Sequence, residues 1–208
     1  LTGVYGKVIK VKDNGDGTYG VKVGKYVAKI GNVYYETIAD AIDAAQAGDT
    51  ITLIDDVTLT SSIVITDGMD ITIEGNGKTI TGCDGSDVFY VKGGKLTLAE
   101  GLNVHATTDC AIYIRGGDVF TAANLTKADG TNYHVIQGNG NYAGNVTITG
   151  GIVKHLNPEK AAIYWPQNGK LTITGGEITG YVAVHMCSGS LEITGGTLHG
   201  TGVGGNYE

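Results

Sequence analysis

The sequence predicts an all-β fold, a parallel β-helix of about seven coils with an N-terminal β-hairpin and a short capping α-helix. The first observation is a degenerate repeat typified by Lys170 to Gly180, KLTITGGEITG, in which an alternating strand, a double-glycine corner and a second strand follow one another. The copies are 20 to 27 residues apart, a period typical of solenoids. They begin at Ile51, Ile71, Leu96, Val119, Val146, Leu171 and Leu191.

The second observation is a further strand in most periods, and the third is the glycine content of the corners. The chain holds 35 glycines and only two prolines, which suits corners that need a positive φ. Coils this short cannot bury an apolar face alone, so we expect each strand to pair with the same strand of the next coil. The further strands are Val88 to Val91, Ala111 to Ile114, His134 to Gln137, Ala162 to Trp165 and Val182 to Met186.

Residues 1–35 are expected to form an N-terminal hairpin segment. Val8 to Lys12 and Tyr19 to Val23 flank the sequence DNGDG, which is strong hairpin-turn chemistry. The acidic turn also suggests a calcium loop, but Gly15 stands where an EF-hand loop has Asp or Asn, so an ordinary hairpin is favoured. A second, smaller hairpin is expected over residues 26–35.

Residues 36–48 are expected to be a capping helix, and residues 49–208 the β-helix. Thr37 with Asp40 three residues later indicates a helix start, and Gly48 indicates its end, so the helix should run from Thr37 to Ala47. A helix at this place would cover the apolar end of the first coil. The sequence begins without Met and stops without a capping element, so we expect a piece of a longer protein with a truncated C-terminal end.

Charge and composition argue against two classes of partner. The net charge is -7 and Arg115 is the only arginine, whereas phosphate binding needs clustered Lys and Arg, so nucleic acid is not expected as a partner. No run of eighteen apolar residues occurs, so membrane insertion is not expected. Cys83, Cys110 and Cys187 show no metal-binding spacing, and their disulfide status stays open.

The run VAKIGNVYYETIADAIDAAQAGDTITLIDDVTL, followed by coils such as AAIYWPQNGKLTITGGEITG, resembles the right-handed β-helix modules of large surface proteins of gut Firmicutes, in the pectin-lyase-like fold group. The resemblance covers about residues 27–200. It implies a right-handed β-helix that is secreted, attached to the cell surface and joined to neighbouring domains. It does not imply one function, because this fold carries lyases, hydrolases, adhesins and spacers.

A polysaccharide lyase or glycoside hydrolase on this scaffold needs carboxylates at matching positions of adjacent coils. Asp87 precedes its strand, but Cys110, Tyr133, Ala161 and Tyr181 take the corresponding places in the next coils. The remaining acids fall at unmatched offsets, namely Asp84, Asp109, Asp118, Asp129 and Glu159. No catalytic residue, metal ligand or cofactor is therefore predicted, and a polysaccharide-active enzyme or its degenerate relative stays the alternative.

Two other residue types repeat, histidine and threonine, but neither predicts a functional site. His105, His155 and His199 are expected in one column of the third strand, on alternate coils about 10 Å apart, too far for one zinc ion. Outward threonine pairs on two coils are similar to an ice-binding array, but Glu74, Ala99, Phe120 and Glu192 interrupt it, and β-propensity explains the threonines.

The candidate site is an aromatic column with two cations beside it. If Ile112, Ile114, Val135, Ile163, Val184 and Met186 point inward, then Tyr90, Tyr113, Ile136, Tyr164 and His185 point outward on successive coils. Lys92 and Arg115 lie beside them in neighbouring coils, where they could hold a uronate or sialate carboxylate. Trp165 should point inward, unless Pro166 turns it out to join the site.

The sequence therefore predicts a non-catalytic module that binds carbohydrate or a host surface glycoprotein, or that serves as a structural stalk. The candidate ligand-binding residues are Tyr90, Lys92, Tyr113, Arg115, Tyr164, Trp165 and His185.

Overall fold

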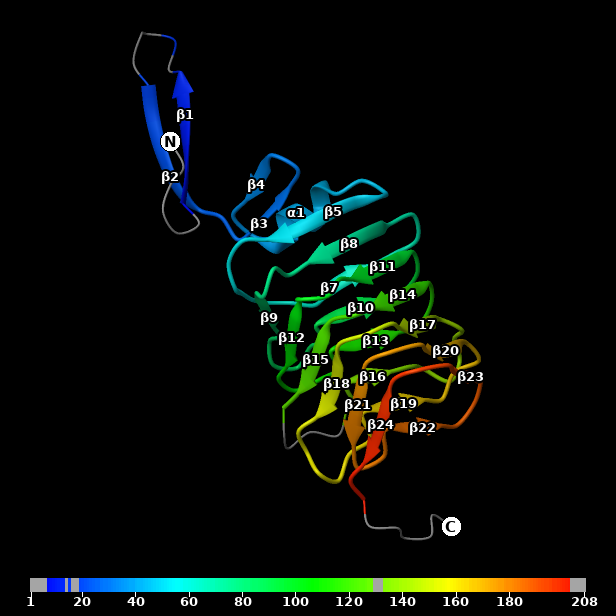
Figure 1. The fold of residues 1–208 in the computed structure, drawn as a ribbon. Coiled ribbons are helices and arrows are strands. Elements are labelled where there is room, and N and C mark those ends of the chain that lie inside the picture. Colours follow the sequence, from blue (N-terminus) through cyan, green and yellow to red (C-terminus); the bar gives the residue numbers. More distant parts are fainter. Residues whose placement is uncertain (1–6, 14, 16–18, 129–132, 203–208) are drawn as a thin grey trace.

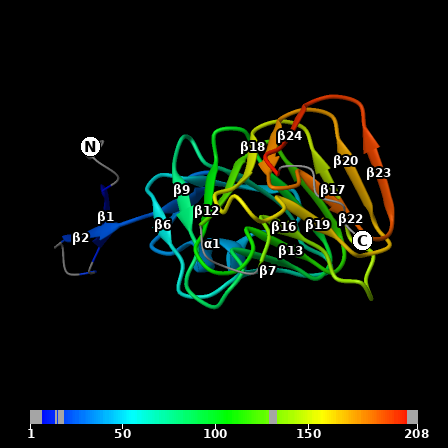
Figure 2. The same ribbon diagram turned by 90° about the horizontal axis from the view of Figure 1, so that it is seen from below.

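The computed structural model describes residues 7–13, 15, 19–128 and 133–202. The chain winds into a right-handed parallel β-solenoid of about six turns, with one helix in the described part (Figure 1). A view turned by 90° shows the three solenoid sheets around a common axis (Figure 2). No helix within the described ranges is long and apolar enough to cross a membrane.

Three sheets form the walls, and a separate antiparallel hairpin, β1 (Lys7–Asp13) with β2 (Tyr19–Lys25), precedes them. The nine-stranded sheet contains β4 (Val33–Tyr35), β3 (Ala28–Ile30), β5 (Asp49–Leu53), β8 (Asp70–Glu74), β11 (Lys95–Leu98), β14 (Asp118–Thr121), β17 (Asn145–Ile148), β20 (Lys170–Ile173) and β23 (Ser190–Ile193). The seven-stranded sheet contains β6 (Val57–Thr58), β9 (Thr79–Thr81), β12 (Asn103–Ala106), β15 (Asn124–Lys127), β18 (Ile152–His155), β21 (Glu177–Gly180) and β24 (Thr197–Gly200). The six-stranded sheet contains β7 (Ile63–Ile65), β10 (Phe89–Val91), β13 (Ile112–Ile114), β16 (Ile136–Gln137), β19 (Ile163–Trp165) and β22 (Val184–Met186).

The predicted strands, their parallel stacking and both N-terminal hairpins are confirmed. The number of coils is smaller than the predicted seven, because within the described residues the seventh repeat supplies only β23 and β24. The turn for which a calcium loop was considered lies mostly outside the described residues.

The core forms because side chains of one kind lie above one another on successive coils. In the nine-stranded sheet Ile71, Leu96, Val119, Val146 and Leu171 stack in register, and each is at most 1% exposed. Leu191 continues this row in β23 but is 39% exposed, because no described coil covers it. Each coil thus buries its aliphatic side chains against its neighbours rather than within itself.

The glycine corners let the chain turn while successive coils stay in contact. Gly117 adopts a φ of 73°, and a Cβ atom there would lie 2.3 Å from the carbonyl oxygen of Gly94 in the preceding coil. Both conditions favour glycine, as the double-glycine motif predicts.

The N-terminal end carries α1 (Ile38–Ala44) and the antiparallel strands β3 and β4. Thr37 is the N-cap, and its Oγ1 accepts a hydrogen bond from the backbone N–H of Asp40 at 3.1 Å, as predicted. The helix ends three residues earlier than expected, because Asp49 draws residues 46–49 into a turn. Its Oδ2 accepts from the N–H of Gln46 at 2.8 Å, and its N–H donates to the oxygen of Gln46 at 3.0 Å.

Two polar side chains, Lys127 and His155, lie inside the solenoid in register with each other. Lys127 Nζ donates to the oxygen of Thr107 at 3.2 Å. His155 Nε2 donates to the oxygen of Tyr133 at 2.9 Å, while its Nδ1 accepts from the N–H of Asn157 at 3.0 Å. The neutral ring is therefore fully hydrogen-bonded, and protonation of Nδ1 would break the bond to Asn157.

The first prediction tests the stacking register. Ile173 is fully buried between Ile148 and Ile193, so Ile173→Asp places an unpaired charge in the core. We expect the free energy of unfolding to fall by several kcal/mol, enough to abolish cooperative unfolding in a domain of ordinary stability. Thermal melts followed by circular dichroism measure this effect. Thr174→Asp at the exposed neighbouring position is the control and should melt near the wild-type temperature. If Ile173→Asp also melted near the wild-type temperature, the register would be wrong.

The second prediction concerns pH. Burial lowers the pKa of His155 below its ordinary value of 6.5, with smaller contributions from Lys127, His134 and Lys160, and burial also lowers the pKa of His134. The unfolded chain then takes up protons below about pH 6.5 before the folded chain does, so stability is present above that pH and is lost as pH falls.

Chemical denaturation between pH 7.5 and 5.5 should show a falling free energy of unfolding, by at most about 1.4 kcal/mol per pH unit for each such group. His155→Gln should lower stability at both pH values and reduce this slope. Equal slopes for the variant and the wild type would show that His155 does not titrate as described.

Candidate functional site

The outer face of the six-stranded sheet carries a column of large side chains, one for each coil. The parallel register places Val64, Tyr90, Tyr113, Gln137, Tyr164 and His185 above one another. Four of these were predicted for the column, namely Tyr90, Tyr113, Tyr164 and His185. The prediction that Ile136 belongs to it is wrong, because Ile136 is buried and Gln137 takes its place.

The reason is a pattern shared by the starts of β10, β13, β16 and β19. Two consecutive side chains point into the core before the outward one, as in Val135 and Ile136 ahead of Gln137. The chain bends into the strand at the first of the two, so strict alternation begins only with the second. The pairs Val88–Phe89, Ala111–Ile112 and Ala162–Ile163 carry the same signal in the sequence.

Tyr90 and Tyr113 form the centre of a group that we call the tyrosine cluster, together with Lys92, Arg115 and Tyr142. The rings of Tyr90 and Tyr113 lie 5.6 Å apart at 48°. Lys92 Nζ lies 4.8 Å from the Tyr90 ring centroid, and Arg115 Cζ lies 5.3 Å from the same centroid. The structure thus brings together four of the predicted site residues, with both cations directed at one ring.

Tyr142 and Asn139 belong to the site but were not predicted from the sequence. They come from the segment between β16 and β17, which is longer than the corresponding corners of other coils. The Arg115 Cζ lies 5.2 Å from the Tyr142 ring and 5.6 Å from the Tyr113 ring. Asn139 Nδ2 donates to the Tyr113 hydroxyl at 2.7 Å. The 27-residue spacing between Val119 and Val146, the longest in the chain, was the available signal.

The positive charges of the tyrosine cluster have no carboxylate partner among the described residues. The ion pairs among the described residues involve other cations, namely Lys25, Lys95 and Lys170. A hydrogen bond with Tyr113 is the main cause that raises the pKa of Arg115, so its guanidinium stays charged. Its Nε is buried without a hydrogen-bond partner. The cluster therefore presents two cations on a chain whose net charge is -7.

A second group, the histidine cluster, contains His134, Tyr164 and His185. The His134 and Tyr164 rings stack with centroids 5.0 Å apart, and Tyr164 and His185 meet edge to face at 5.2 Å. His134 Nδ1 donates to the oxygen of Ala161 at 2.9 Å, and this bond holds its ring beside Tyr164. Gln137 lies between Tyr113 and Tyr164, so it separates the two clusters.

Trp165, the remaining predicted site residue, lies inside the solenoid. Its side chain is fully buried, and its Nε1 donates to the oxygen of Gly169 at 3.1 Å. Pro166 does not turn it outward. Because no part of the indole reaches solvent, Trp165 supports the sheet from within and cannot contact a ligand on the outer face.

Asp87 is the acidic residue placed next to the column. Its Oδ1 accepts from the backbone N–H of Cys110 at 3.0 Å, and burial raises its pKa, with a further contribution from Asp109. Cys110 is buried, and this burial raises the pKa of its thiol, so the thiol is a poor nucleophile. Asp87 therefore orders the corner between two coils.

The histidines of the seven-stranded sheet are arranged differently from the prediction. His105 and His199 belong to one outward column, in which Thr126, Lys154 and Thr179 lie between them. The placement of His155 in this column was wrong, because Val153 pairs with Leu125 and thereby turns His155 inward. No group of three or more His, Cys, Asp or Glu side chains within the described ranges could hold a metal ion.

Comparisons of the chain with protein-family models, with curated proteins and with solved structures gave no match.

Proposed function

We propose that this chain is a non-catalytic, carbohydrate-binding β-helix module of a cell-surface protein, and that it binds an acidic glycan along the outer face of the six-stranded sheet. The observation that carries the proposal is the convergence of Lys92 and Arg115 on the ring of Tyr90, at 4.8 and 5.3 Å. Like charges in such positions repel each other, and a bound anion between them would relieve the repulsion.

The chemistry of the cluster favours a carboxylate or sulfate carried by a sugar. A guanidinium group binds a carboxylate through two parallel hydrogen bonds, which gives both strength and orientation. The tyrosine rings offer apolar faces with a hydroxyl at one end, a surface on which the C–H face of a sugar can pack. Coils are about 4.8 Å apart, so a glycan that follows the axis meets a new side chain of the column at each step.

The two clusters supply different contacts for such a glycan. The tyrosine cluster would bind the acidic sugar, and Tyr164 and His185, two and three coils beyond Tyr113, would contact further sugars together with His134. Tyr142 is 42% exposed and stands at the edge of the cluster, where it can close over a bound sugar. The likeness to β-helix modules of the pectin-lyase-like group in surface proteins of gut Firmicutes supports an extracellular, cell-attached location.

The third prediction tests the cations. Binding of polygalacturonate, sialyllactose and heparin, measured by titration calorimetry beside neutral dextran, should show affinity for acidic glycans alone. The affinity should fall between 0.05 and 0.5 M NaCl, because salt screens the exposed charges. Arg115→Gln should weaken binding by at least about tenfold, because it removes one charge-assisted contact. Arg115→Lys keeps the charge and should weaken binding less.

The matched control for Arg115 lies on the neighbouring sheet. Lys95 Nζ is 5.9 Å from the Phe120 ring, a similar pairing of cation and ring, but Lys95 also pairs with Asp70 at 3.3 Å. Lys95→Gln with Phe120→Ala should leave binding unchanged. Equal binding of neutral and acidic glycans, or equal losses in both variants, would refute the assignment. Release of reducing ends from these glycans would instead support the alternative, a polysaccharide-active enzyme.

The fourth prediction tests the rings. Tyr113→Ala combined with Tyr164→Ala should abolish glycan binding, because each side chain supplies contact area in a different cluster. The melting temperature should fall by only a few degrees, since both side chains lie on the outer face. Unchanged binding by the folded double variant would show that the column is purely structural.

A further inference from the structure

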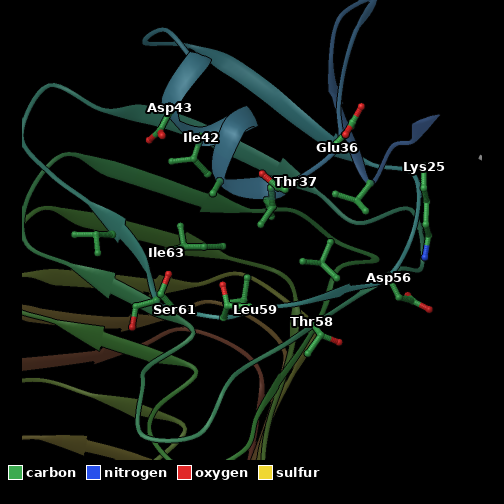
Figure 3. Close-up of a pocket in the computed structure, with 17 residues that line it drawn as sticks. Lys25, Glu36, Thr37, Ile42, Asp43, Asp56, Thr58, Leu59, Ser61 and Ile63 are labelled. Carbon is green, nitrogen blue, oxygen red and sulfur yellow. The ribbon is translucent and has the colours of Figure 1, made fainter. Parts of the chain in front are cut away.

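The N-terminal end of the solenoid is stepped, and the step contains a pocket. The nine-stranded sheet continues past the first coil through β3 and β4, whereas the other two sheets begin at β7 and β6. Between α1 and the first coil lies a pocket of about 610 Å³, which we call the notch (Figure 3). Figure 3 shows Thr37 and Ile42 of the helix region on one side, and Leu59, Ser61 and Ile63 on the other.

The strand β7 presents an open backbone edge beside the notch. The N–H of Ile63 donates to Val88 at 2.9 Å, and the oxygen of Ile65 accepts from Lys92 at 2.8 Å, so both residues bond to the second coil. Alternate residues of a strand direct their backbone groups to opposite sides, so the N–H and C=O of Val64 face away from β10. The sheet order gives β7 no second neighbour among the described strands. An open edge of this kind is a template for another strand.

The strand β6 repeats the arrangement on the adjoining wall. The N–H of Leu59 donates to Thr81 at 2.9 Å, which directs the backbone groups of Thr58 away from β9. Both Thr58 and Val64 line the notch. The pocket thus runs beside two open edges that meet at the first corner of the solenoid.

The lining of the notch indicates the chemistry of its occupant. Ile42, Leu59 and Ile63 provide an apolar floor, and hydroxyl groups surround it. Glu36, Asp43 and Asp56 are the acidic residues that line the notch, and its lysine, Lys25, pairs with Asp55 at 3.2 Å. A partner that carries aliphatic side chains between lysines or arginines matches both the floor and the charge.

A second copy of this chain does not fit the notch. Stacking of one solenoid on another requires all three edges to be open at the same level, and here β3, β4 and α1 stand above the edges of β6 and β7. A single extended segment needs no such level face, and 610 Å³ accommodates a few side chains.

We propose that the notch docks an extended, basic peptide segment of a partner protein, which adds a strand to the open edge of β7. The backbone of Val64 supplies one donor and one acceptor to the added strand, and alternate aliphatic side chains of the peptide fill the apolar floor. Lysine or arginine residues of the peptide face Asp43 and Asp56. This site is at the opposite end of the molecule from the histidine cluster and is independent of glycan binding.

The fifth prediction uses Val64→Pro, which removes the outward N–H and leaves the bonds of Ile63 and Ile65 to the second coil in place. Proline is tolerated at such edge positions. The probe is a fluorescein-labelled peptide, Lys-Val-Thr-Val-Lys-Lys, and the readout is fluorescence anisotropy. We expect the wild type and Val64→Thr to bind it, Val64→Pro to bind at least tenfold more weakly, and Asp43→Asn to bind several-fold more weakly.

Backbone hydrogen exchange provides the second measurement, which does not depend on any variant. Added peptide should slow exchange of the Val64 amide in the wild type, and a peptide with Glu in place of each Lys should not. Equal affinity of Val64→Pro and Val64→Thr, equal binding of the acidic peptide, or no binding at millimolar peptide would each overturn the proposal. Arg115→Gln should leave peptide binding unchanged, so failure here is separable from failure of the glycan proposal.

Discussion

The structure depends on one interaction, the parallel pairing of each strand with its equivalent in the next coil. Its hydrogen bonds run along the solenoid axis and hold identical or similar side chains above one another, as in the row from Ile71 to Leu171. A coil has almost no core of its own, so the core exists only through stacking. The same pairing fixes the outer surface, because a column of inward aliphatics implies a column of outward side chains beside it.

That constraint explains how a functional face can be built from a weak repeat. Tyr90 and Tyr113 need no contacts of their own to be aligned, since the ladder between β10 and β13 aligns them. Specific chemistry then enters where the repeat is broken. The long segment after β16 brings Asn139 and Tyr142 over the column. The regular coils supply the platform, and the irregular segment supplies the polar and aromatic contacts that close it.

The sequence predicted the parts of the fold that repeat and was less accurate where the repeat changes. Spacing and alternation were enough to predict the three strands of most coils, and Thr37 with Asp40 was enough for the start of α1. The inward turn of Ile136 and of His155 followed from local register, which depends on where the chain bends into each strand. Alternation alone cannot locate that bend. The end of α1 depended on a side-chain contact of Asp49 that competes with the helix.

Within the candidate site, the neighbouring placement of Lys92 and Arg115 could be predicted because both follow the same strand of adjacent coils. Their convergence on one ring could not, because Arg115 lies beyond the strand end, where contacts with Tyr113 and Tyr142 set the direction of its side chain. Trp165 illustrates the reverse case. Alternation placed it inward, and the following proline was a reason to doubt this, yet the hydrogen bond to Gly169 holds the indole in the core.

The direction of the hydrogen bonds also determines how the molecule responds to mechanical force. A pull along the solenoid axis loads the ladders of a terminal coil one bond after another, so coils peel away in succession instead of shearing together. Each detached coil releases one repeat of 20 to 27 residues, or roughly 65 to 95 Å of extended chain. A module of this design, held between a cell and a bound surface, would lengthen in steps under tension while the remaining coils keep their outer face intact.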